Sequence, residues 1–470
     1  MATLAYTPLD EIPKIRERAR HAFFSGKLKS NSYRREQIAQ VGYLLKDNEQ
    51  RFRDALKADL GRPELETDFI DFSGSYVDIR TAYDSVDKWT AAQKAEFNLS
   101  FWAMGPKHKA EPKGVVFIIA PFNGPLVMLL SPLVGAIAGG NAAVLKPSEQ
   151  TPVTSALLAE LVPKYLDNDL FHIINGGVPE TTLALELQWD HIMYTGNGRV
   201  ARIIATAAAK HLTPLTLELG EYVLVPYGTQ DALIAAMKEI YEEFYPEGPK
   251  NSQSFARIVG IHHAKRIKNL LDNTKGTIVL GGETDVENRY IAPTVVKDVK
   301  SGDSLLTDEI FGPVLALVPV KDTDEAIAFI NARDHPLVVY VFSQDKAFQD
   351  KVFSNTKSGS AVANEVVIIV GVPGLPMGGV GPSGYGYYTG RDMFEQFTHK
   401  RAFIDNPSWV DKLGFSARFP PYKSIKPLQA LLPALPPRPS GKIASGSARR
   451  WTLLLFTAVL VGVTSMVLTQ

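Results

Sequence analysis

The feature that most constrains the fold is a regular alternation of short β-type runs and longer helical runs that begins after Gly114. The β-type runs are residues 115–120, 142–145, 171–176, 191–196 and 215–220, and the helical runs are residues 126–140, 155–166 and 199–210. Such an alternation predicts a mostly parallel sheet covered by helices. We expect ligand sites where strand ends meet helix starts, because open parallel sheets bind ligands there.

The alternation fails once, at the junction of Gly220 and Glu221. The β-type run 215–220 is followed directly by a second one, residues 221–228, with no helix between them. Neighbouring parallel strands need a crossover of about a dozen residues or more, and ordinary strands are only about five or six residues long. We therefore predict that a segment is missing at this junction.

Beyond the junction the alternation resumes and predicts a second α/β unit. Helical runs cover residues 231–244 and 324–333, and β-type runs cover residues 278–282, 292–296, 314–320 and 337–343. Residues 1–62 have helical apolar spacing, interrupted at Pro13 and at residues 61–63, which predicts a helical N-terminal segment.

The C-terminal region differs in composition from the rest of the chain. Residues 420–450 are rich in proline, serine and basic residues, which is typical of a tether, and residues 451–468 carry no charge. A helix of this length nearly crosses a bilayer, so we predict a tail anchor; a buried core helix is the alternative. Arg449 and Arg450 immediately precede the run, which predicts that the body faces the cytosol. The N-terminus lacks the apolar core that secretion requires.

Charge and composition exclude several classes of function. The chain has 50 basic and 50 acidic residues, so no net field attracts nucleic acid. It contains no cysteine, which excludes disulfides, thiolate metal sites and thiol catalysis. No metal motif is present either, because His262 and His263 are adjacent and cannot share a helix face; we expect both to be solvated.

A glycine-containing turn follows the β-type run 191–195. Gly196, Asn197 and Gly198 begin a Gly-x-Gly-x-x-Ala pattern that leads into the helical run 199–210. Backbone amides in such a turn can hold a pyrophosphate, although tight turns of this composition also occur for structural reasons. Glu218 lies near the offset expected for a ribose-binding acid, but the residues alone do not separate that role from a general base.

Two further clusters contain residue types suited to chemistry. Asn123, in the turn 121–125, could donate to an oxyanion, and Lys146 could reach a sugar hydroxyl, although a turn asparagine and a helix cap explain this cluster slightly better. The segment 309–313 and the glycine-rich segment 376–386 permit close approach of the backbone to a ligand, and structural turns have the same composition.

Taken together, these motifs resemble the aldehyde dehydrogenase superfamily, particularly its class 3 or fatty aldehyde branch. Seven segments occur in the family's order over residues 10–405: PFNGP, GNAAVLKPSE, YTGN, KHLTPLTLELG, APTVV, DEIFGPVL and LPMGGVGPSGYGYYTG. Several independent motifs in register make the resemblance specific. That branch also includes microsomal enzymes with a C-terminal membrane anchor, which the tail of this chain resembles.

The resemblance implies roles for individual residues. Asn123 corresponds to the oxyanion-hole asparagine and Glu218 to the general base. The cofactor, NAD or NADP, would be bound by Lys146 and Glu149 at the adenosine ribose, by the turn Gly196, Asn197 and Gly198, and by Glu309 and Phe311 at the nicotinamide ribose. Two departures are local: Phe122 and Gly124 replace an aromatic pair, and Ala201 replaces a glycine.

The third departure affects the chemistry. Family members attack the aldehyde with a cysteine thiolate, and the loop that carries this cysteine would follow Gly220, where this chain continues at once with Glu221. Ser254 is a poor replacement, because it lies in a segment resembling one downstream of that loop and a serine needs an activating base.

Three hypotheses follow. The first is NAD(P)-dependent oxidation of a long-chain or lipophilic aldehyde, with the missing segment skipped in the sequence. The second is a catalytically inactive relative that binds nucleotide or serves as a structural subunit. The third is a different hydride-transfer or hydrolytic reaction that uses Glu218 or Ser254.

We therefore expect an aldehyde dehydrogenase-like α/β fold with two parallel-sheet domains and a transmembrane tail. The predicted boundaries are residues 1–212 for the N-terminal helices and a Rossmann-like cofactor domain, 213–405 for a shortened catalytic domain, 406–450 for a linker and 451–470 for the anchor. The expected partners are a small aldehyde, a membrane of the endoplasmic reticulum or another organelle, and a second copy in a homodimer, with no metal and no nucleic acid.

Overall fold

A computed structural model describes residues 4–218, 223–307 and 309–421, together with residues 424, 426–429 and 436. By internal contacts the chain divides into two units. Unit 1 comprises residues 1–94 and 107–403, and unit 2 comprises residues 95–106 and 404–470. The boundaries predicted from the sequence follow a different principle, the division between two sheets, and stay predictions.

The N-terminal part of unit 1 is helical, as predicted. Its helices are α1 (Glu11–Phe24), α2 (Asn31–Lys46), α3 (Glu49–Leu60), α4 (Glu64–Glu66), η2 (Thr67–Ser73) and α5 (Gly74–Thr90). Pro13 does not interrupt a helix, contrary to the sequence interpretation, because it lies in the first turn of α1, where the missing amide hydrogen is not needed.

The centre of unit 1 is a six-stranded sheet with the order β16-β7-β6-β3-β4-β5. The strands are β3 (Val115–Ile119), β4 (Ala142–Lys146), β5 (Phe171–Ile173), β6 (His191–Tyr194), β7 (Leu215–Glu218) and β16 (Gly384–Tyr385). Strands β3 to β7 are parallel to their neighbours, and only β16 is antiparallel. The alternation of the sequence therefore predicted these five parallel strands correctly.

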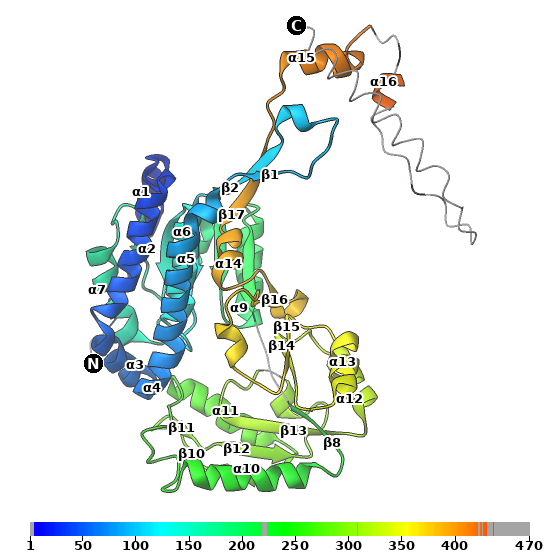
Figure 1. The fold of residues 1–470 in the computed structure, drawn as a ribbon. Coiled ribbons are helices and arrows are strands. Elements are labelled where there is room, and N and C mark those ends of the chain that lie inside the picture. The colour runs from blue at the N-terminus through cyan, green and yellow to red at the C-terminus, as the bar shows by residue number, and fades with distance from the viewer. Residues whose placement is uncertain are drawn as a thin grey trace, which may run out of the picture. The chain divides into compact units, whose positions relative to one another are not determined.

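Four helices connect the parallel strands: α6 (Val127–Gly139), α7 (Pro152–Tyr165), α8 (Val178–Glu186) and α9 (Gly198–Ala209). The chain winds from β3 to β4 and β5 in one direction and returns to β6 and β7 in the other. Figure 1 draws this part of the chain in cyan and green, beside the N-terminal helices in blue. Because such crossovers are right-handed, the pair α6 and α7 and the pair α8 and α9 cover opposite faces.

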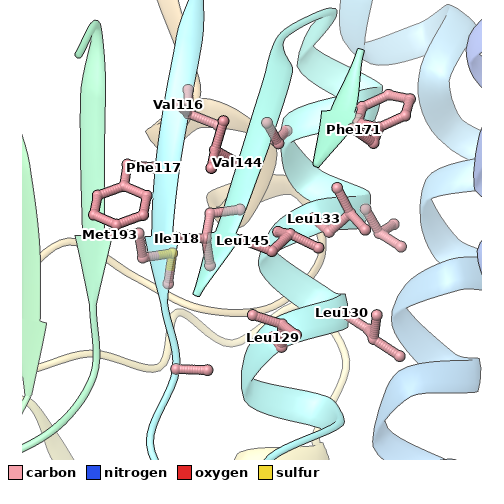
Figure 2. Close-up of a cluster of buried hydrophobic side chains, with 14 of the residues drawn as sticks. Val116, Phe117, Ile118, Leu129, Leu130, Leu133, Val144, Leu145, Phe171 and Met193 are labelled. Carbon is pink, nitrogen blue, oxygen red and sulfur yellow. The ribbon is translucent and has the colours of Figure 1, made fainter. Parts of the chain in front are cut away.

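The hydrophobic core lies between the sheet and α6. Figure 2 shows Leu129, Leu130 and Leu133 on α6, the helix that packs against β3 and β4, and all three side chains are fully buried. A strand enclosed on both faces is apolar at every position, which explains why residues 115–120 form an uninterrupted apolar run rather than an alternating one.

Asn141 fastens this core to the C-terminal part of unit 1. Its side chain is fully buried, accepts from the Gly114 amide (2.9 Å) and donates to the carbonyl oxygens of Ala136 (3.1 Å) and Phe397 (2.9 Å). Phe397 follows α14 (Gly390–Gln396), and β17 (Thr398–Phe403) then pairs with β2 (Lys107–Pro112), which also pairs with β1 (Gln93–Lys94).

A second sheet, with the order β8-β13-β12-β9, follows the junction. Its strands are β8 (Val223–Pro226), β9 (Thr277–Leu280), β12 (Thr294–Lys297) and β13 (Val314–Val320), with the helices α10 (Gln230–Phe244) and α11 (Ile261–Asn273) and the hairpin β10 (Thr284–Asp285) and β11 (Tyr290–Ile291). Strands β7 and β8, which abut in the sequence, thus belong to different sheets.

The segment that follows the second sheet, residues 323–371, has few buried side chains. Strands β14 (Val338–Val341) and β15 (Ser360–Ala363) form a parallel sheet of only two strands, flanked by α12 (Thr323–Asn331) and α13 (Lys346–Asn355). No residue of α12 is fully buried, although its sequence is amphipathic, and Phe342 and Ile368 are exposed. Apolar side chains in this state are typical of a region whose packing partner is absent.

Unit 2 contains the loop between β1 and β2, with η3 (Trp102–Met104), and a C-terminal segment with α15 (Ser408–Val410), η7 (Asp411–Phe415), η8 (Ser416–Arg418) and α16 (Lys426–Gln429). Within the part of the chain that the structure describes, no helix has the length and apolarity needed to span a bilayer. The predicted anchor, residues 451–468, lies outside the described residues.

Candidate functional site

The predicted site residues follow strands of the central sheet that end level with one another. Ile119, the last residue of β3, pairs with Lys146 at the end of β4 and with Tyr194 at the end of β6. The direction of winding reverses between β3 and β6, and the crevice at such a reversal is where open α/β sheets bind ligands. The sheet therefore brings the predicted cofactor turn and the Asn123 loop to the same edge.

A buried ion pair holds the backbone of the Asn123 loop. The Arg62 guanidinium donates to the carbonyl oxygen of Asn123 and pairs with the Asp71 carboxylate at 2.5 Å. The other Asp71 oxygen accepts from the amides of Leu126 (3.0 Å) and Val127 (2.9 Å) at the start of α6. Asp71 is fully buried and the Asn123 side chain is exposed. The pair thus fixes the loop while leaving the Asn123 amide accessible.

Lys146 and Glu149 contact one another after β4. The Lys146 ammonium lies 2.5 Å from a carboxylate oxygen of Glu149 and donates to the carbonyl oxygen of Pro147 at 3.3 Å. Lys146 is 5% exposed, whereas Glu149 is half-buried. The Glu149 carboxylate and the Pro147 carbonyl oxygen therefore orient the Lys146 side chain at the end of its strand.

Aromatic side chains join this edge of the sheet to the second sheet. The rings of Phe122 and Phe311 lie 5.2 Å apart in an edge-to-face arrangement, and Phe122 also contacts the His263 ring at 5.6 Å. His263 is hydrogen-bonded to the Gln150 side chain at 2.8 Å. The loops after β3 and β4, the start of α11 and the loop before β13 therefore meet at one cluster.

His263 corrects one expectation. It is not solvated as predicted; it is half-buried, and burial, together with the positive charge of His262 and Arg266, lowers its pKa to about 4. His262 is exposed, as expected. Among the residues that the structure describes, no group of three or more His, Asp or Glu side chains is placed to hold a metal ion.

Arg266, one turn after His263 on α11, holds the backbone that carries Glu309. Its guanidinium donates to the carbonyl oxygens of Glu309 (3.1 Å) and Ile310. Phe311 has a φ of 48°, a conformation that is uncommon for a bulky residue and persists only when its surroundings impose it. Arg266 is not among the predicted site residues, although a basic residue three positions after a histidine on one helix face is a detectable signal.

The glycine turn after β6, residues 196–198, caps helix α9 and also leads into a helix start of the kind that binds anions. Asn197 caps α9, since its side chain accepts from the Val200 amide at 3.0 Å. A Cβ at Gly196 would lie 2.3 Å from the Tyr194 hydroxyl, so a larger residue fits there only if the Tyr194 ring moves. Gly198 begins α9, whose first-turn amides have no partner within the helix, and such a helix start attracts anionic groups.

Glu218 and Ser254, the two other predicted reactive residues, lie on other elements. The backbone of Glu218 ends β7 opposite Gly384 of β16, and its side chain lies outside the described part of the structure. Ser254 lies in an exposed turn in which its amide donates to the Ser252 hydroxyl. The chemical roles assigned to the site residues by resemblance stay predictions.

The sequence pattern of the aldehyde dehydrogenase family matches residues 1–222 and 220–403. The chain belongs to this family. Its members are NAD- or NADP-dependent oxidoreductases, and the membership confirms the family predicted from the motifs. The parallel sheets confirm the predicted α/β fold as well.

Two relatives illustrate the similarity. Aldehyde dehydrogenase family 3 member A2 of Rattus norvegicus is 39% identical over 424 residues, covering 82% of this chain and 86% of the relative. The dimeric NADP-preferring aldehyde dehydrogenase of Rattus norvegicus is 36% identical over 446 residues, covering 87% of this chain and 98% of the relative.

Solved structures agree with the family. The substrate-bound state of Staphylococcus aureus AldH is 31% identical and superposes with a TM-score of 0.85 over 89% of this chain and 99% of that one. An NAD+ complex of a Mycobacterium tuberculosis aldehyde dehydrogenase, 23% identical with a TM-score of 0.76 over 86% of this chain and 92% of that one, shares the fold.

The matches also bear on the junction. The two matched segments of the family pattern meet at residues 220–222. The alignment with the Rattus norvegicus member A2 runs over 424 positions, whereas 82% of the 470-residue chain is about 385 residues. The difference, about 40 positions, is long enough for a strand with a crossover helix.

Proposed function

We propose that this chain serves the NAD(P)-dependent oxidation of a lipophilic aldehyde to its carboxylic acid. The observation that carries the proposal is the common edge at which β3, β4 and β6 end, because it gathers Asn123, Lys146 and the Gly196 turn where the strand order reverses. The family supplies the reaction class, and the C-terminal apolar run of the sequence supports a lipophilic substrate.

The residues at this edge fit a dinucleotide. The start of α9, where Asn197 and Arg199 are exposed, would hold a pyrophosphate, and the Lys146–Glu149 pair would offer an ammonium and a carboxylate to ribose hydroxyls. Glu309 and Phe311, positioned by Arg266, would contact the nicotinamide half. The bound cofactor would accept a hydride from the substrate. Asn123 would donate its side-chain amide to the oxygen of the reacting carbonyl, and Glu218 would activate water.

The nucleophile of this reaction is absent from the 470 residues, since the chain has no cysteine. We propose that it belongs to a segment between Gly220 and Glu221. Two observations support this location: the break in the strand and helix alternation, and the meeting of the two matched segments of the family pattern at residues 220–222. The about 40 unmatched alignment positions and the weak burial of α12 beside the two-stranded sheet β14-β15 fit a missing segment of this size. A longer form of the chain would then carry the activity.

The composition favours a second candidate for the chain as it stands. A polypeptide without a thiol cannot form the covalent adduct on which the family's reaction depends, yet it retains the residues proposed to bind nucleotide. In this form the protein would bind NAD or NADP without turning over aldehyde, or would serve as a structural subunit.

One pair of measurements separates the two candidates. Reading the transcript across residues 215–226 shows whether an in-frame segment is skipped, and aldehyde oxidation assays with short-chain and long-chain aldehydes test the polypeptide itself. A junction confirmed in the dominant transcript, with an inactive protein, removes the first candidate. Turnover by the 470-residue polypeptide removes the second and contradicts our assignment of the missing nucleophile.

Nucleotide binding tests the site that both candidates share. We expect Lys146→Met to weaken NADH binding at least about tenfold, equivalent to about 1.4 kcal/mol. Lys164→Met is the matched control, because Lys164 is an exposed lysine that pairs with Glu160 on the surface of α7. Equal affinities of both variants and the parent would refute the proposed site.

Two assembly proposals accompany the reaction. We propose that residues 451–468 anchor the protein in the membrane of the endoplasmic reticulum or another organelle with its body in the cytosol, which alkaline extraction and protease protection of the full chain would test. We also propose a homodimer, in line with the dimeric relative, and light scattering of the detergent-solubilised protein would measure its mass.

A further inference from the structure

Lys113 places a half-buried amine against a buried imidazole at the edge of the central sheet where its strands begin. The residue lies between β2 and β3, and its backbone amide donates to the Phe397 carbonyl oxygen at 3.2 Å. Its side-chain nitrogen lies 3.1 Å from Nδ1 of His191, the first residue of β6, which is 1% exposed. Lysines are rarely buried unless an acidic group pairs with them, so a lysine held by a second basic group needs an explanation.

The hydrogen bonds run in one direction from this lysine into the sheet. A lysine ammonium has only donors, so Nδ1 of His191 accepts and the ring proton is on Nε2. Nε2 lies 3.3 Å from the Thr216 hydroxyl on β7, which in turn lies 3.5 Å from the side-chain oxygen of Gln396 on α14. The ring of Phe397 packs edge-to-face on the imidazole at 5.4 Å. These contacts fix the imidazole and, through it, one N–H of the lysine.

No carboxylate compensates the charge of this arrangement. Among the described residues Lys113 has no ion-pair partner, and burial lowers the pKa of its amine to about 8. Burial, together with the positive charge of Lys113, holds the pKa of His191 well below its ordinary range, so the imidazole is neutral. At pH 7.5 about a quarter of the Lys113 amine is therefore uncharged, against about 0.1% for an ordinary lysine. Lys113 thus carries a nucleophilic lone pair near neutral pH.

The three side chains meet the structural requirements of an activated nucleophile. Such a site holds the nucleophile by a hydrogen bond to a neighbouring basic side chain, which a third group orients in turn, and lysines become nucleophilic when they are desolvated. Lys113, His191 and Thr216 take these three positions. The chain has no cysteine, so no thiolate competes with its amines for a carbonyl group.

The cluster lies at the edge of the sheet opposite the predicted cofactor site. Lys113 precedes Val115, the first residue of β3, whereas Asn123 follows Ile119, the last one. At about 3.3 Å per residue, the two ends of β3 are about 13 Å apart. A molecule bound to Lys113 is therefore separate from a ligand bound beside Asn123.

We propose that Lys113 is a covalent aldehyde-binding site, at which the side-chain amine forms a reversible imine with small aliphatic aldehydes. The nitrogen lone pair forms a bond to the carbonyl carbon, and the carbonyl oxygen takes up a proton to give a carbinolamine. The carbinolamine then loses this oxygen together with the two hydrogens of the amine as one water molecule, which leaves a C=N bond. No oxidant or cofactor takes part, so the site does not depend on the aldehyde oxidation proposed above.

Reductive trapping tests the proposal on the full chain. The protein is incubated at pH 7.5 with propionaldehyde and sodium cyanoborohydride, which reduces the imine to a stable secondary amine. Peptide mapping by mass spectrometry then measures the alkylation of each amine separately, including the N-terminal one. We expect Lys113 to be alkylated at least about tenfold faster than Lys88, an exposed lysine of α5, because much more of its amine is uncharged.

Variants of His191 test the contact that holds the amine. His191→Asp places a carboxylate beside the amine and keeps it charged, so the preference for Lys113 should disappear. His191→Asn is the matched neutral control and should retain the preference. Circular dichroism and an unchanged alkylation rate at Lys88 confirm that both variants are folded. Lys113→Arg should remove the adduct that forms first when the aldehyde is limiting.

Each contrary outcome identifies what fails. Equal alkylation rates at Lys113 and Lys88 overturn the proposal. A preference that persists in a folded His191→Asp protein overturns the role of the imidazole. Protection of Lys113 by saturating NADH overturns the separation of this site from the cofactor edge. Preferential alkylation in a protein that binds no NADH supports the proposal and removes only the nucleotide site proposed above.

Discussion

The buried pair of Arg62 and Asp71 provides the sharpest test of how this site is built. Replacing Asp71 with alanine leaves the Arg62 guanidinium buried without its carboxylate and removes the acceptor of two amides at the start of α6. Breaking a buried ion pair from one side costs about 3–5 kcal/mol. Because domains are stable by only about 5–15 kcal/mol, we expect Asp71→Ala to lose a large part of the free energy of unfolding.

Urea unfolding followed by circular dichroism measures this loss, and the matched control is Asp68→Ala. Asp68 also faces an arginine, Arg53 at 2.7 Å, but its side chain is 44% exposed, so its removal should cost no more than about 1 kcal/mol. Asp71→Asn keeps an oxygen for the α6 amides and loses the charge. Its loss of unfolding free energy should therefore lie between the losses of Asp71→Ala and Asp68→Ala. Equal stabilities of the Asp71→Ala and Asp68→Ala variants would refute our account of the buried Arg62–Asp71 pair.

Three further predictions address other parts of unit 1. The folded-state pKa of His263, about 4, lies below its ordinary value of 6.5, so its contribution to stability is complete above pH 6.5 and is lost as the pH falls toward 4; His263→Asn should flatten urea midpoints measured across this range. Asn141→Ala should cost about 3 kcal/mol by leaving buried backbone groups unpaired, whereas Asn288→Ala at an exposed turn should cost less than about 0.5 kcal/mol, both read from urea unfolding. Gly196→Ala should weaken NADH binding measured by calorimetry, because the added methyl group would displace the Tyr194 ring at the end of β6. Gly371→Ala is the control and should leave NADH binding unchanged, because a methyl group there meets nothing within 4 Å.

The periodic parts of the fold could be predicted from the sequence. The strands of the central sheet are apolar at every position because both of their faces are covered, and this produces the runs that alternate with helices. The junction was detectable for the same reason, since a parallel sheet requires a crossover between its neighbours. These patterns indicate the type of each element and whether helices cover both faces of the sheet.

Contacts made by polar residues across the fold could not be predicted in this way. Asp71 and Arg62 look like surface residues of a helical segment, and only the tertiary structure buries them beneath the Asn123 loop. His263 was assigned to solvent because no sequence pattern reveals that Phe122 and Gln150 approach it from other loops. Pro13 was misread because its effect depends on whether it lies in the first turn of a helix or further along.

The separation of β7 and β8 into different sheets limits how the body can move. Only five peptide steps join Glu218 to Val223, and a chain of that length reaches at most about 18 Å. This short connection therefore limits how far the end of β7 and the start of β8 can move apart. Any hinge opening that admits a dinucleotide must fit within that reach, whereas a chain about 40 residues longer at the same place would open without this restraint.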